Sequence, residues 1–385
     1  MAHVLILGGG FGGLAAAHEL RGALGDGDRI TVVDRGDRFF MGFAKLWDLG
    51  GIRPLAEGSV PLAKLRDRGI EFVQTEILAI DPARRIVDTD AERYQPDAVL
   101  VALGAGPAPA HRQLLAAAGG HDLYDAAALP AMRAALDRID GGRVLVAIMG
   151  MPIKCPPAPY EAAFIVAERL RARGVLGRVE VAVATPQPAT LPVAGPDASR
   201  YLADRLADHG IAFLPGHPVV GADGNSVTFK GGNGGTGEET LEVALLLGVP
   251  ACAPPPVLAA SPLVGDTGWI APDPRTMRTA FDRVYAVGDC TVVPTPGGQL
   301  PKAGVFAAAE GRVAARNIVA DLHGGDEAEF DGYGFCFLEL PGRQVAFVEG
   351  HFLAEPSDVH LTDATEARFR DKQEFERERL AAWLG

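Results

Sequence analysis

Cysteine is scarce in this chain of 385 residues, and its cysteines lie far apart. They form no C-x-x-C pair, and no histidine stands at the spacing typical of a zinc site; the four are Cys155, Cys252, Cys290 and Cys336. The spacing therefore predicts no metal site. In a reducing compartment, two of the four could still take part in catalysis.

Positive charge is also in short supply. Lys and Arg number 36 against 49 Asp and Glu, which gives a formal net charge of −13. Nucleic acids and anionic membranes attract basic surfaces, so we expect no nucleic-acid binding and at most peripheral membrane contact. No basic segment or small-residue cleavage site typical of a secretory signal follows Met1. We therefore expect a cytoplasmic protein, with peripheral contact to the inner face of the membrane left open.

No apolar segment is suited to crossing a membrane. The longest uncharged stretch, Val243–Gly265, contains five prolines, and these exclude a spanning helix. Hydrophobic residues still make up 48% of the chain, which is enough for a large core in two or three domains. The 48 glycines and 29 prolines fit a loop-rich α/β protein.

The first twenty residues show the pattern of a dinucleotide-binding unit. The apolar run Val4–Leu7 leads into a glycine turn, and a helical pattern follows from Leu14. Gly8, Gly10 and Gly13 have the G-x-G-x-x-G spacing, in which the glycines make the turn, admit a pyrophosphate and let the helix approach the strand. The phosphates would lie at the helix N-terminus, where unpaired N–H groups favour anions.

Later segments add candidate partners for the cofactor. A second strand ends at Asp34, about 20 residues after the glycine turn, where a carboxylate can accept hydrogen bonds from an adenosine ribose. Another buried strand with a glycine turn follows at Asp97–Gly106, and the strand in Val284–Thr291 ends before Asp289. That aspartate can bind a ribityl hydroxyl, and the helix Lys302–Ile318 would turn its N-terminus to a flavin. The pattern therefore favours FAD over NAD.

A second unit repeats the strand, helix, strand order at Arg143–Ile148, Ala158–Arg173 and Arg178–Ala184. A nicotinamide dinucleotide would need a glycine-rich turn after the first of these strands. Prolines and a cysteine stand there instead, in Gly150–Cys155. We infer a second Rossmann-like unit without a normal NAD(P)H site.

The remaining segments complete the expected architecture. A hairpin is predicted around Pro341-Gly342, and a highly charged helix over Glu366–Gly385 is expected to pack against the body or a second subunit. The aromatic segment Arg35–Gly58 could wall a planar ring system or supply core residues under a loop.

We therefore expect an α/β protein with two Rossmann-like, three-layer units and a small C-terminal α+β region. The FAD-binding unit is predicted over residues 1–108 and 266–322. The second, degenerate nucleotide-binding unit is predicted over 109–265, and the C-terminal region over 323–385.

Several motifs carry a resemblance to a known family. GGGFGG, ALGAG, VYAVGDC and PKAG resemble the flavoprotein disulfide oxidoreductases with two dinucleotide folds. Within that superfamily, Lys154–Glu161 (KCPPAPYE) and Gly334–Phe337 (GFCF) are similar to the sulfide:quinone oxidoreductases and the flavoprotein of flavocytochrome c sulfide dehydrogenase. The resemblance implies FAD in the first unit, at Gly8, Gly10, Phe11, Gly12, Gly13, Asp34, Arg35, Ile77, Ala102, Gly104, Gly288, Asp289 and Lys302.

The resemblance also implies a redox-active disulfide between Cys155 and Cys336 beside the flavin. Hydrosulfide would attack it and leave a persulfide, and the remaining thiolate would pass two electrons through FAD to a quinone or another acceptor. The residues themselves support one part of this, because Lys154 and the following helix both favour a thiolate at Cys155. Glu161 matches a proton-relay glutamate of the family, and His121 resembles a family histidine near the cysteines. A helix-surface glutamate and a solvent-facing histidine are the alternatives.

The sequence departs from the family in three ways. Many quinone-linked members have a third cysteine near the region Ala110–Leu129, and this chain has none there. Phe40-Met41-Gly42 stands where the flavocytochrome proteins tether FAD through a cysteine, so we expect non-covalent FAD. The C-terminal tail lacks the apolar surface that members use at membranes, which leaves the acceptor open. Cys252 and Cys290 match neither motif and are interpreted as structural.

Two other functions remain open at this point. The first is an NAD(P)H:acceptor reductase of the type II NADH dehydrogenase kind, which the missing second glycine turn disfavours. The second is a non-catalytic flavin redox sensor, in which the cysteine pair would switch conformation. A homodimer is also left open.

Overall fold

The computed structural model describes residues 1–231, 235, 237–355 and 358–385. Its first sheet is entirely parallel, in the order β20-β9-β1-β2-β5. The strands are β1 (His3–Leu7), β2 (Arg29–Asp34), β5 (Glu71–Gln74), β9 (Ala98–Val101) and β20 (Val284–Ala286). The expected strand, turn and helix at the N-terminus are confirmed, and a strand from late in the chain completes the same sheet.

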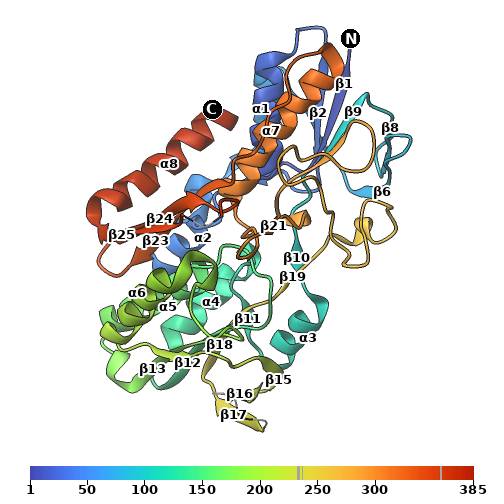
Figure 1. Cartoon of the computed structure of the whole chain (residues 1–385). Helices are drawn as coiled ribbons and strands as arrows, with labels where there is room; N and C mark the ends of the chain where they lie inside the picture. Colours follow the sequence, from blue (N-terminus) through green and yellow to red (C-terminus); the bar gives the residue numbers. More distant parts are fainter. Residues whose placement is uncertain (232–234, 236, 356–357) are drawn as a thin grey trace.

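Both faces of this sheet are covered, which explains its almost wholly apolar strands. On β1, Val4 and Ile6 belong to the core under the helices α1 (Phe11–Ala23) and α7 (Gly304–His323). Leu5 and Leu7 belong to a second core on the other face. A three-stranded meander covers that face; its strands are β6 (Ile77–Asp81), β7 (Ile86–Thr89) and β8 (Arg93–Tyr94). The unit therefore has three layers (Figure 1).

The second large sheet is also parallel, in the order β11-β18-β12-β13-β14. The strands are β11 (His121–Asp122), β12 (Gly142–Ile148), β13 (Val179–Ala184), β14 (Ala212–Leu214) and β18 (Leu245–Val249). The helices of this part are α3 (Pro109–Ala117), α4 (Leu129–Arg138), α5 (Ala158–Ala172) and α6 (Gly195–Asp208). The order β12, α5, β13 confirms the second Rossmann-like unit.

Short elements connect and edge these units. The proline-rich stretch before residue 265 is more than a linker, because β19 (Cys252–Ala253) pairs antiparallel with β10 (Gly106–Pro107). The two connections between the units are thus paired with each other. The other short elements are β3 (Arg38–Phe39), α2 (Ala44–Gly50), β4 (Val60–Pro61), β15 (Val219–Asp223), β16 (Ser226–Lys230), β17 (Glu238–Glu242), β21 (Pro294–Thr295) and β22 (Gly298–Gln299).

The C-terminal part forms a small sheet and a helix. The predicted hairpin is confirmed as β23 (Tyr333–Leu340) and β24 (Gln344–His351), and a third strand that the sequence did not predict, β25 (His360–Thr365), joins β24. Helix α8 (Glu366–Leu384) packs on the body of the same chain, where Phe369 and Trp383 are buried. From this arrangement we propose three domains, with the boundaries predicted from the sequence: 1–108 with 266–322, 109–265, and 323–385.

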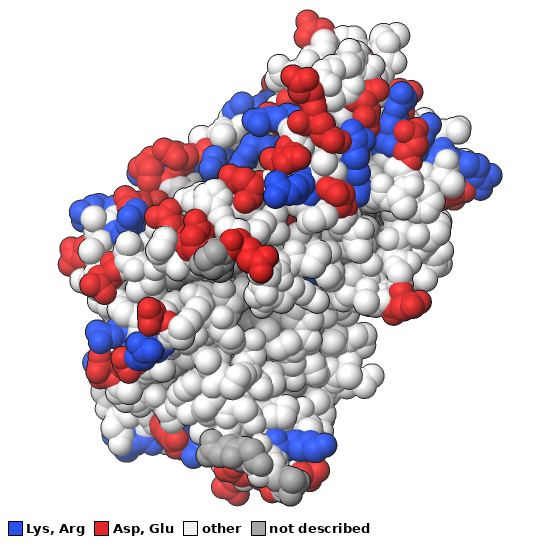
Figure 2. All heavy atoms as spheres, in the orientation of Figure 1, with Lys and Arg blue, Asp and Glu red and all other residues white. Residues whose placement is uncertain are grey.

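Charged side chains of both signs are intermingled over the upper part of the face in Figure 2, and few lie in the middle of that face. The basic residues in view do not gather into a patch for a polyanion, in line with the net charge of −13. In the part of the chain that the structure describes, no helix is long and apolar enough to cross a membrane.

The close approach of α1 and α7 gives a first prediction. A Cβ atom on Gly311 would lie 2.3 Å from the backbone oxygen of Gly12, so Gly311→Ala must push the two helices apart. We expect a loss of about 1–3 kcal/mol in the free energy of unfolding, measured with urea. Gly22→Ala is the matched control, because a Cβ there meets nothing within 4 Å, and it should be neutral or slightly stabilising. Equal stability of the two variants would contradict this contact.

Candidate active site

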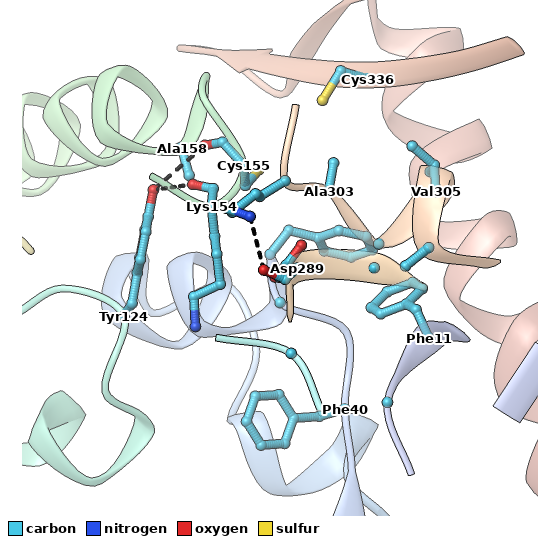
Figure 3. A pocket seen from close by; sticks show the side chains of 18 of the residues that line it. Phe11, Phe40, Tyr124, Lys154, Cys155, Ala158, Asp289, Ala303, Val305 and Cys336 are labelled. Carbon is cyan, nitrogen blue, oxygen red and sulfur yellow. Dashed lines mark hydrogen bonds between the residues drawn. The ribbon is translucent and has the colours of Figure 1, made fainter. Parts of the chain in front are cut away.

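A cavity of about 330 Å³ lies where the loops after β1, β9 and β20 face the second unit and the C-terminal sheet. Figure 3 shows Phe11 and Asp289 from the first unit, Tyr124 and Lys154 from the second, and Cys336 on β23 around this space. Of the predicted flavin-contacting residues, these line the cavity: Gly10, Phe11, Gly12, Ala102, Gly104, Gly288, Asp289 and Lys302.

The glycine turn is built as its spacing predicts. Gly8 has φ +113°, and a Cβ on it would lie 2.3 Å from the Ala102 oxygen; a Cβ on Gly13 would lie 1.9 Å from the Gly8 oxygen. A Cβ on Gly10 would meet nothing within 4 Å, so the backbone there is open to the cavity. Asp34 Oδ2 accepts a hydrogen bond from the Gly9 N–H (2.7 Å), which holds this carboxylate at the turn. The cradle fits a dinucleotide pyrophosphate and ribose.

The loop after β20 presents a carboxylate to the cavity. Burial raises the pKa of Asp289, and among the described residues no donor hydrogen-bonds to its carboxylate. The Lys302 Nζ instead donates to the backbone oxygens of Asp289 (2.8 Å) and Thr291 (2.9 Å). A carboxylate left open in this way fits the hydroxyl groups of a flavin's ribityl chain.

Glu310 on α7 was not predicted as a site residue. Its Oε2 accepts a hydrogen bond from the Gly288 N–H (2.6 Å), and burial raises its pKa to about 7. The residue therefore fixes the loop that carries Asp289. One signal could have revealed it, because it is the one acidic residue in the small-residue stretch KAGVFAAAEG.

The two motif cysteines meet at the cavity. Cys336 projects from the middle of β23 toward the segment that carries Cys155 (Figure 3), and both line the cavity as half-buried free thiols. The neighbouring Cys155 thiol, followed by burial, raises the pKa of Cys336 well above its ordinary value. The structure thus brings together two residues that are 181 positions apart in the sequence.

Backbone contacts hold Cys155 in place. It has φ +45°, its N–H donates to the Lys302 oxygen (2.8 Å), and its own oxygen accepts from the Ala158 N–H at the start of α5 (2.9 Å). The Tyr124 hydroxyl donates to the Lys154 oxygen (2.6 Å). The cysteine loop is therefore fixed to the first unit and to the segment after β11 at the same time.

The other two cysteines lie apart from this pair. Cys252 and Cys290 are buried and do not line the cavity. Burial raises the pKa of Cys252 to about 11 and that of Cys290 to about 12, so both remain protonated near neutral pH. This agrees with a structural role for each.

Glu161 is not on the helix surface. It is 1% exposed, and its Oε1 accepts hydrogen bonds from Lys372 Nζ (3.0 Å) and from the Glu339 N–H (2.8 Å). Lys372 also donates to Glu339 Oε2 (2.8 Å), which in turn accepts from the Trp47 indole (2.8 Å). Burial raises the pKa of Glu161, and Lys372 opposes that rise. Lys372 and Glu339 carried no signal in the sequence, because a charged helix and an alternating strand suggest solvated side chains.

Both interpretations of the early aromatic segment hold in part. Phe39, Phe40 and Phe43 line the cavity, and Phe39 and Trp47 are also buried in the core. Three more aromatic rings line the cavity from β23 and α8, namely Phe335, Phe337 and Phe375. Their centroids lie 5.6–5.8 Å apart in edge or tilted contacts.

Some predicted residues are not among those that line the cavity. His121 is half-buried on β11, and burial lowers its pKa. Arg35 is exposed beyond β2, and Ile77 is buried in the meander. The structure does not bring His121 together with the cysteines in that cavity.

Comparison with known proteins identifies the family. A profile of the family "Pyridine nucleotide-disulphide oxidoreductase" matches residues 2–129 and 161–311. The chain belongs to this family. It is a flavin-dependent oxidoreductase. The unmatched residues 130–160 contain β12 and the Cys155 loop.

Similar proteins confirm the resemblance to sulfide:quinone oxidoreductases. The sulfide-quinone reductase of Aquifex aeolicus is 27% identical over 347 residues, which cover 83% of this chain and 76% of that protein. The mitochondrial sulfide:quinone oxidoreductase of Mus musculus is 21% identical over 374 residues, 95% of this chain and 81% of that protein. The crystal structure of the Aquifex aeolicus sulfide:quinone oxidoreductase has the same fold, with a TM-score of 0.86 and 22% identity over 98% of this chain and 90% of that one.

The contact between the two motif cysteines gives a second prediction. Since the Cys155 thiol raises the pKa of Cys336, Cys155→Ala should lower that pKa, although burial keeps it above the ordinary value. The rate of Cys336 alkylation in the reduced protein can be measured as a function of pH. In the variant, we expect this rate to begin rising at a pH about one unit or more below that of the unaltered protein. Cys252→Ala should leave the profile unchanged. A profile that Cys155→Ala does not move would show that the two thiols do not interact.

The buried ion cluster gives a third prediction. Lys372→Met leaves two buried carboxylates, those of Glu161 and Glu339, without their cation, and we expect a loss of about 3–5 kcal/mol in unfolding free energy. Burial raises the pKa of Glu161. The decrease in unfolding free energy should therefore be larger at higher pH, where this buried carboxyl group would have to carry its charge without Lys372. Urea unfolding at two pH values measures this. Lys230→Met, at an exposed position on β16, is the control and should change little.

Proposed function

We propose that this protein oxidises sulfide, or a related small sulfur species, through a redox disulfide between Cys155 and Cys336. Two electrons would pass through FAD to a quinone or another acceptor. The observation that carries the proposal is the meeting of the two thiols in a cavity lined by the glycine turn and the Asp289 loop. The similar proteins named above, a sulfide-quinone reductase and a sulfide:quinone oxidoreductase, support the same chemistry.

The cysteines would carry the covalent part of the reaction. Hydrosulfide attacks one sulfur of the disulfide, a new S–S bond forms as the old one breaks, and the products are a persulfide on one cysteine and a thiolate on the other. FAD, when bound, supplies the two-electron acceptor that this thiolate requires. A second hydrosulfide would take the outer sulfur of the persulfide as a hydropersulfide anion and leave a second cysteine thiolate. The two thiolates would then give up two electrons as the S–S bond between Cys155 and Cys336 forms again.

The chain's own residues would hold FAD without a covalent bond. Gly10 would leave room for the pyrophosphate, Asp34 at the glycine turn would accept hydrogen bonds from the ribose, and the open Asp289 carboxylate lines the cavity. Phe40, Met41 and Gly42 offer no nucleophile to a flavin methyl group. The Lys302 ammonium beside the same loop favours negative charge on the bound ring.

Aromatic side chains that line the cavity could bind the ring of a quinone. Phe335, Phe337 and Phe375 form an aromatic wall, and Phe40 lines the same space. Flat aromatic surfaces of this kind bind planar rings through burial and stacking. This wall supports a quinone as acceptor over a small hydrophilic oxidant.

An NAD(P)H donor finds less support. A nicotinamide dinucleotide would need open backbone after β12, but a Cβ on Gly150 would lie 2.6 Å from the His111 ring. The same turn is held by the hydrogen bond from the Cys252 N–H to the Pro152 oxygen (2.7 Å). Gly150 and Pro152 are thus held by contacts within the protein, and prolines and Cys155 follow where a glycine-rich phosphate turn would be expected.

The donor can be tested directly by anaerobic mixing of the oxidised holoprotein with sulfide or NADH in a stopped-flow instrument. We expect sulfide, and not NADH, to bleach the visible flavin absorbance. Cys155→Ser should slow this bleaching by about a hundredfold or more while FAD stays bound. Cys252→Ser, a buried thiol outside the cavity, should bleach like the unaltered protein. Bleaching by NADH alone, or retained bleaching in Cys155→Ser, would refute the proposal.

A further inference from the structure

Two lysines line the part of the cavity that contains Cys155. Lys45 comes from α2 in the first unit, and Lys154 immediately precedes Cys155 in the second. The proposed disulfide chemistry uses neither of them. The sequence points to Lys154, because it immediately precedes Cys155, whereas no sequence motif contains Lys45.

Among the described residues, neither lysine forms an ion pair with a carboxylate. Lys154 does act on Asp289 across the same cavity, although burial still raises the pKa of that carboxyl group. Lys45 Nζ donates to the Tyr124 backbone oxygen (2.6 Å) and lies 5.4 Å from the centre of the Tyr124 ring. Lys154 Nζ donates to the Ala105 oxygen (3.2 Å). Over residues 1–231, 235, 237–355 and 358–385, neither ammonium forms an ion pair. Each retains N–H groups that these contacts do not use.

The acidic residues nearby do not cancel this charge. Asp122 on β11 accepts the Tyr124 N–H (2.8 Å), and burial raises its pKa, which disfavours its negative form. Asp125 accepts the Ala127 N–H at the start of a short helical turn. Burial, together with the charge of Lys154, lowers the pKa of Lys45 to about 8. Two like charges in a partly desolvated space are costly, and an anion between them would relieve that cost.

We propose that Lys45 and Lys154 form a subsite for a small sulfur anion beside Cys155. The class of ligand is a singly charged sulfur nucleophile, of which hydrosulfide is the smallest. This assignment rests on the function proposed above, because that reaction supplies the anion.

The arrangement also couples the position of the anion to that of the thiol. Tyr124 holds Lys45 through its backbone oxygen and the Lys154 oxygen through its hydroxyl, at 2.6 Å in each case. Tyr124 therefore holds the Lys45 ammonium and the backbone of the Cys155 loop at the same time, while the Lys154 ammonium is held by the Ala105 oxygen. A nucleophile held by the lysines would start close to the sulfur that it must attack.

The charge on the subsite can be measured with two alkylating reagents of nearly the same shape. Iodoacetate is an anion and iodoacetamide is neutral, and both transfer a carbon to the thiolate with loss of iodide. In the reduced Cys336→Ser holoprotein, labelling reports on Cys155, since Cys252 and Cys290 are buried with raised pKa values. We expect Lys45→Met to lower the ratio of the iodoacetate rate to the iodoacetamide rate by about threefold or more.

The ratio separates anion attraction from other roles of Lys45. A change in folding or in the thiolate fraction of Cys155 would alter both rates equally and leave the ratio unchanged, and that result would overturn the proposal. Lys154→Met should lower the ratio as Lys45→Met does. Lys230→Met makes the same charge change on β16 and should leave it unaltered.

A pH series provides a test without any change at the lysines. As the pH rises through about 8, Lys45 loses its charge. The ratio of the iodoacetate rate to the iodoacetamide rate should therefore fall with rising pH in the Cys336→Ser protein. In the double variant Cys336→Ser, Lys45→Met, the ratio should not change with pH. The other groups that face Lys45 are Lys154, Asp122, Asp125 and Cys155. A ratio that does not change with pH would count against the subsite. Because no sulfide is used, a lowered ratio together with a flavin that sulfide does not bleach would refute the proposed function and leave the anion subsite standing.

Discussion

The active site depends on Lys302, because this one residue joins its two halves. Its backbone oxygen accepts the Cys155 N–H at 2.8 Å, while its ammonium donates to the oxygens of Asp289 and Thr291. Burial lowers the pKa of the ammonium, and the two carbonyl contacts, together with the face of Trp269 at 3.8 Å, offset that cost. The cysteine loop and the loop that carries Asp289 are therefore held to each other, as the proposed electron transfer between a cysteine sulfur and a flavin would require.

A second set of contacts holds the C-terminal helix α8 against the site. Lys372 brings a charge from α8 into the interior, where Glu161 of the second unit and Glu339 of β23 receive it. Buried charges of this kind require well-formed partners, so the position of α8 is set closely. Arg53 adds to this through a bidentate contact with Glu376, at 2.7 and 2.8 Å. A helix that looks too polar to pack is in this way fixed against the strand that carries Cys336.

Local patterns predicted most of the fold. The glycine turn, the strand before Asp34 and the strand before Asp289 each follow from neighbouring residues, so a short sequence window contains the information. Glu161, Lys372 and Lys45 differ, because their roles arise from partners that are distant in the sequence and only the folded chain brings together. The same holds for Cys155 and Cys336, whose pairing came from a family resemblance and not from their spacing. A third strand in the C-terminal sheet was missed since β25 is mostly exposed and polar, without the apolar alternation that marks a strand.

The second unit shows how one local structure serves two kinds of chemistry. In a nucleotide-binding unit, the start of the helix after the first strand faces a phosphate, because its free N–H groups favour negative charge. Here α5 starts three residues after Cys155, and the Ala158 N–H donates to the Cys155 oxygen. Gly150 packs closely against the His111 ring, and the start of α5 favours negative charge beside Cys155. A sulfur nucleophile and its anionic products require the same electrostatic environment as a phosphate, so this fold can lose its nucleotide and keep that field for sulfur chemistry.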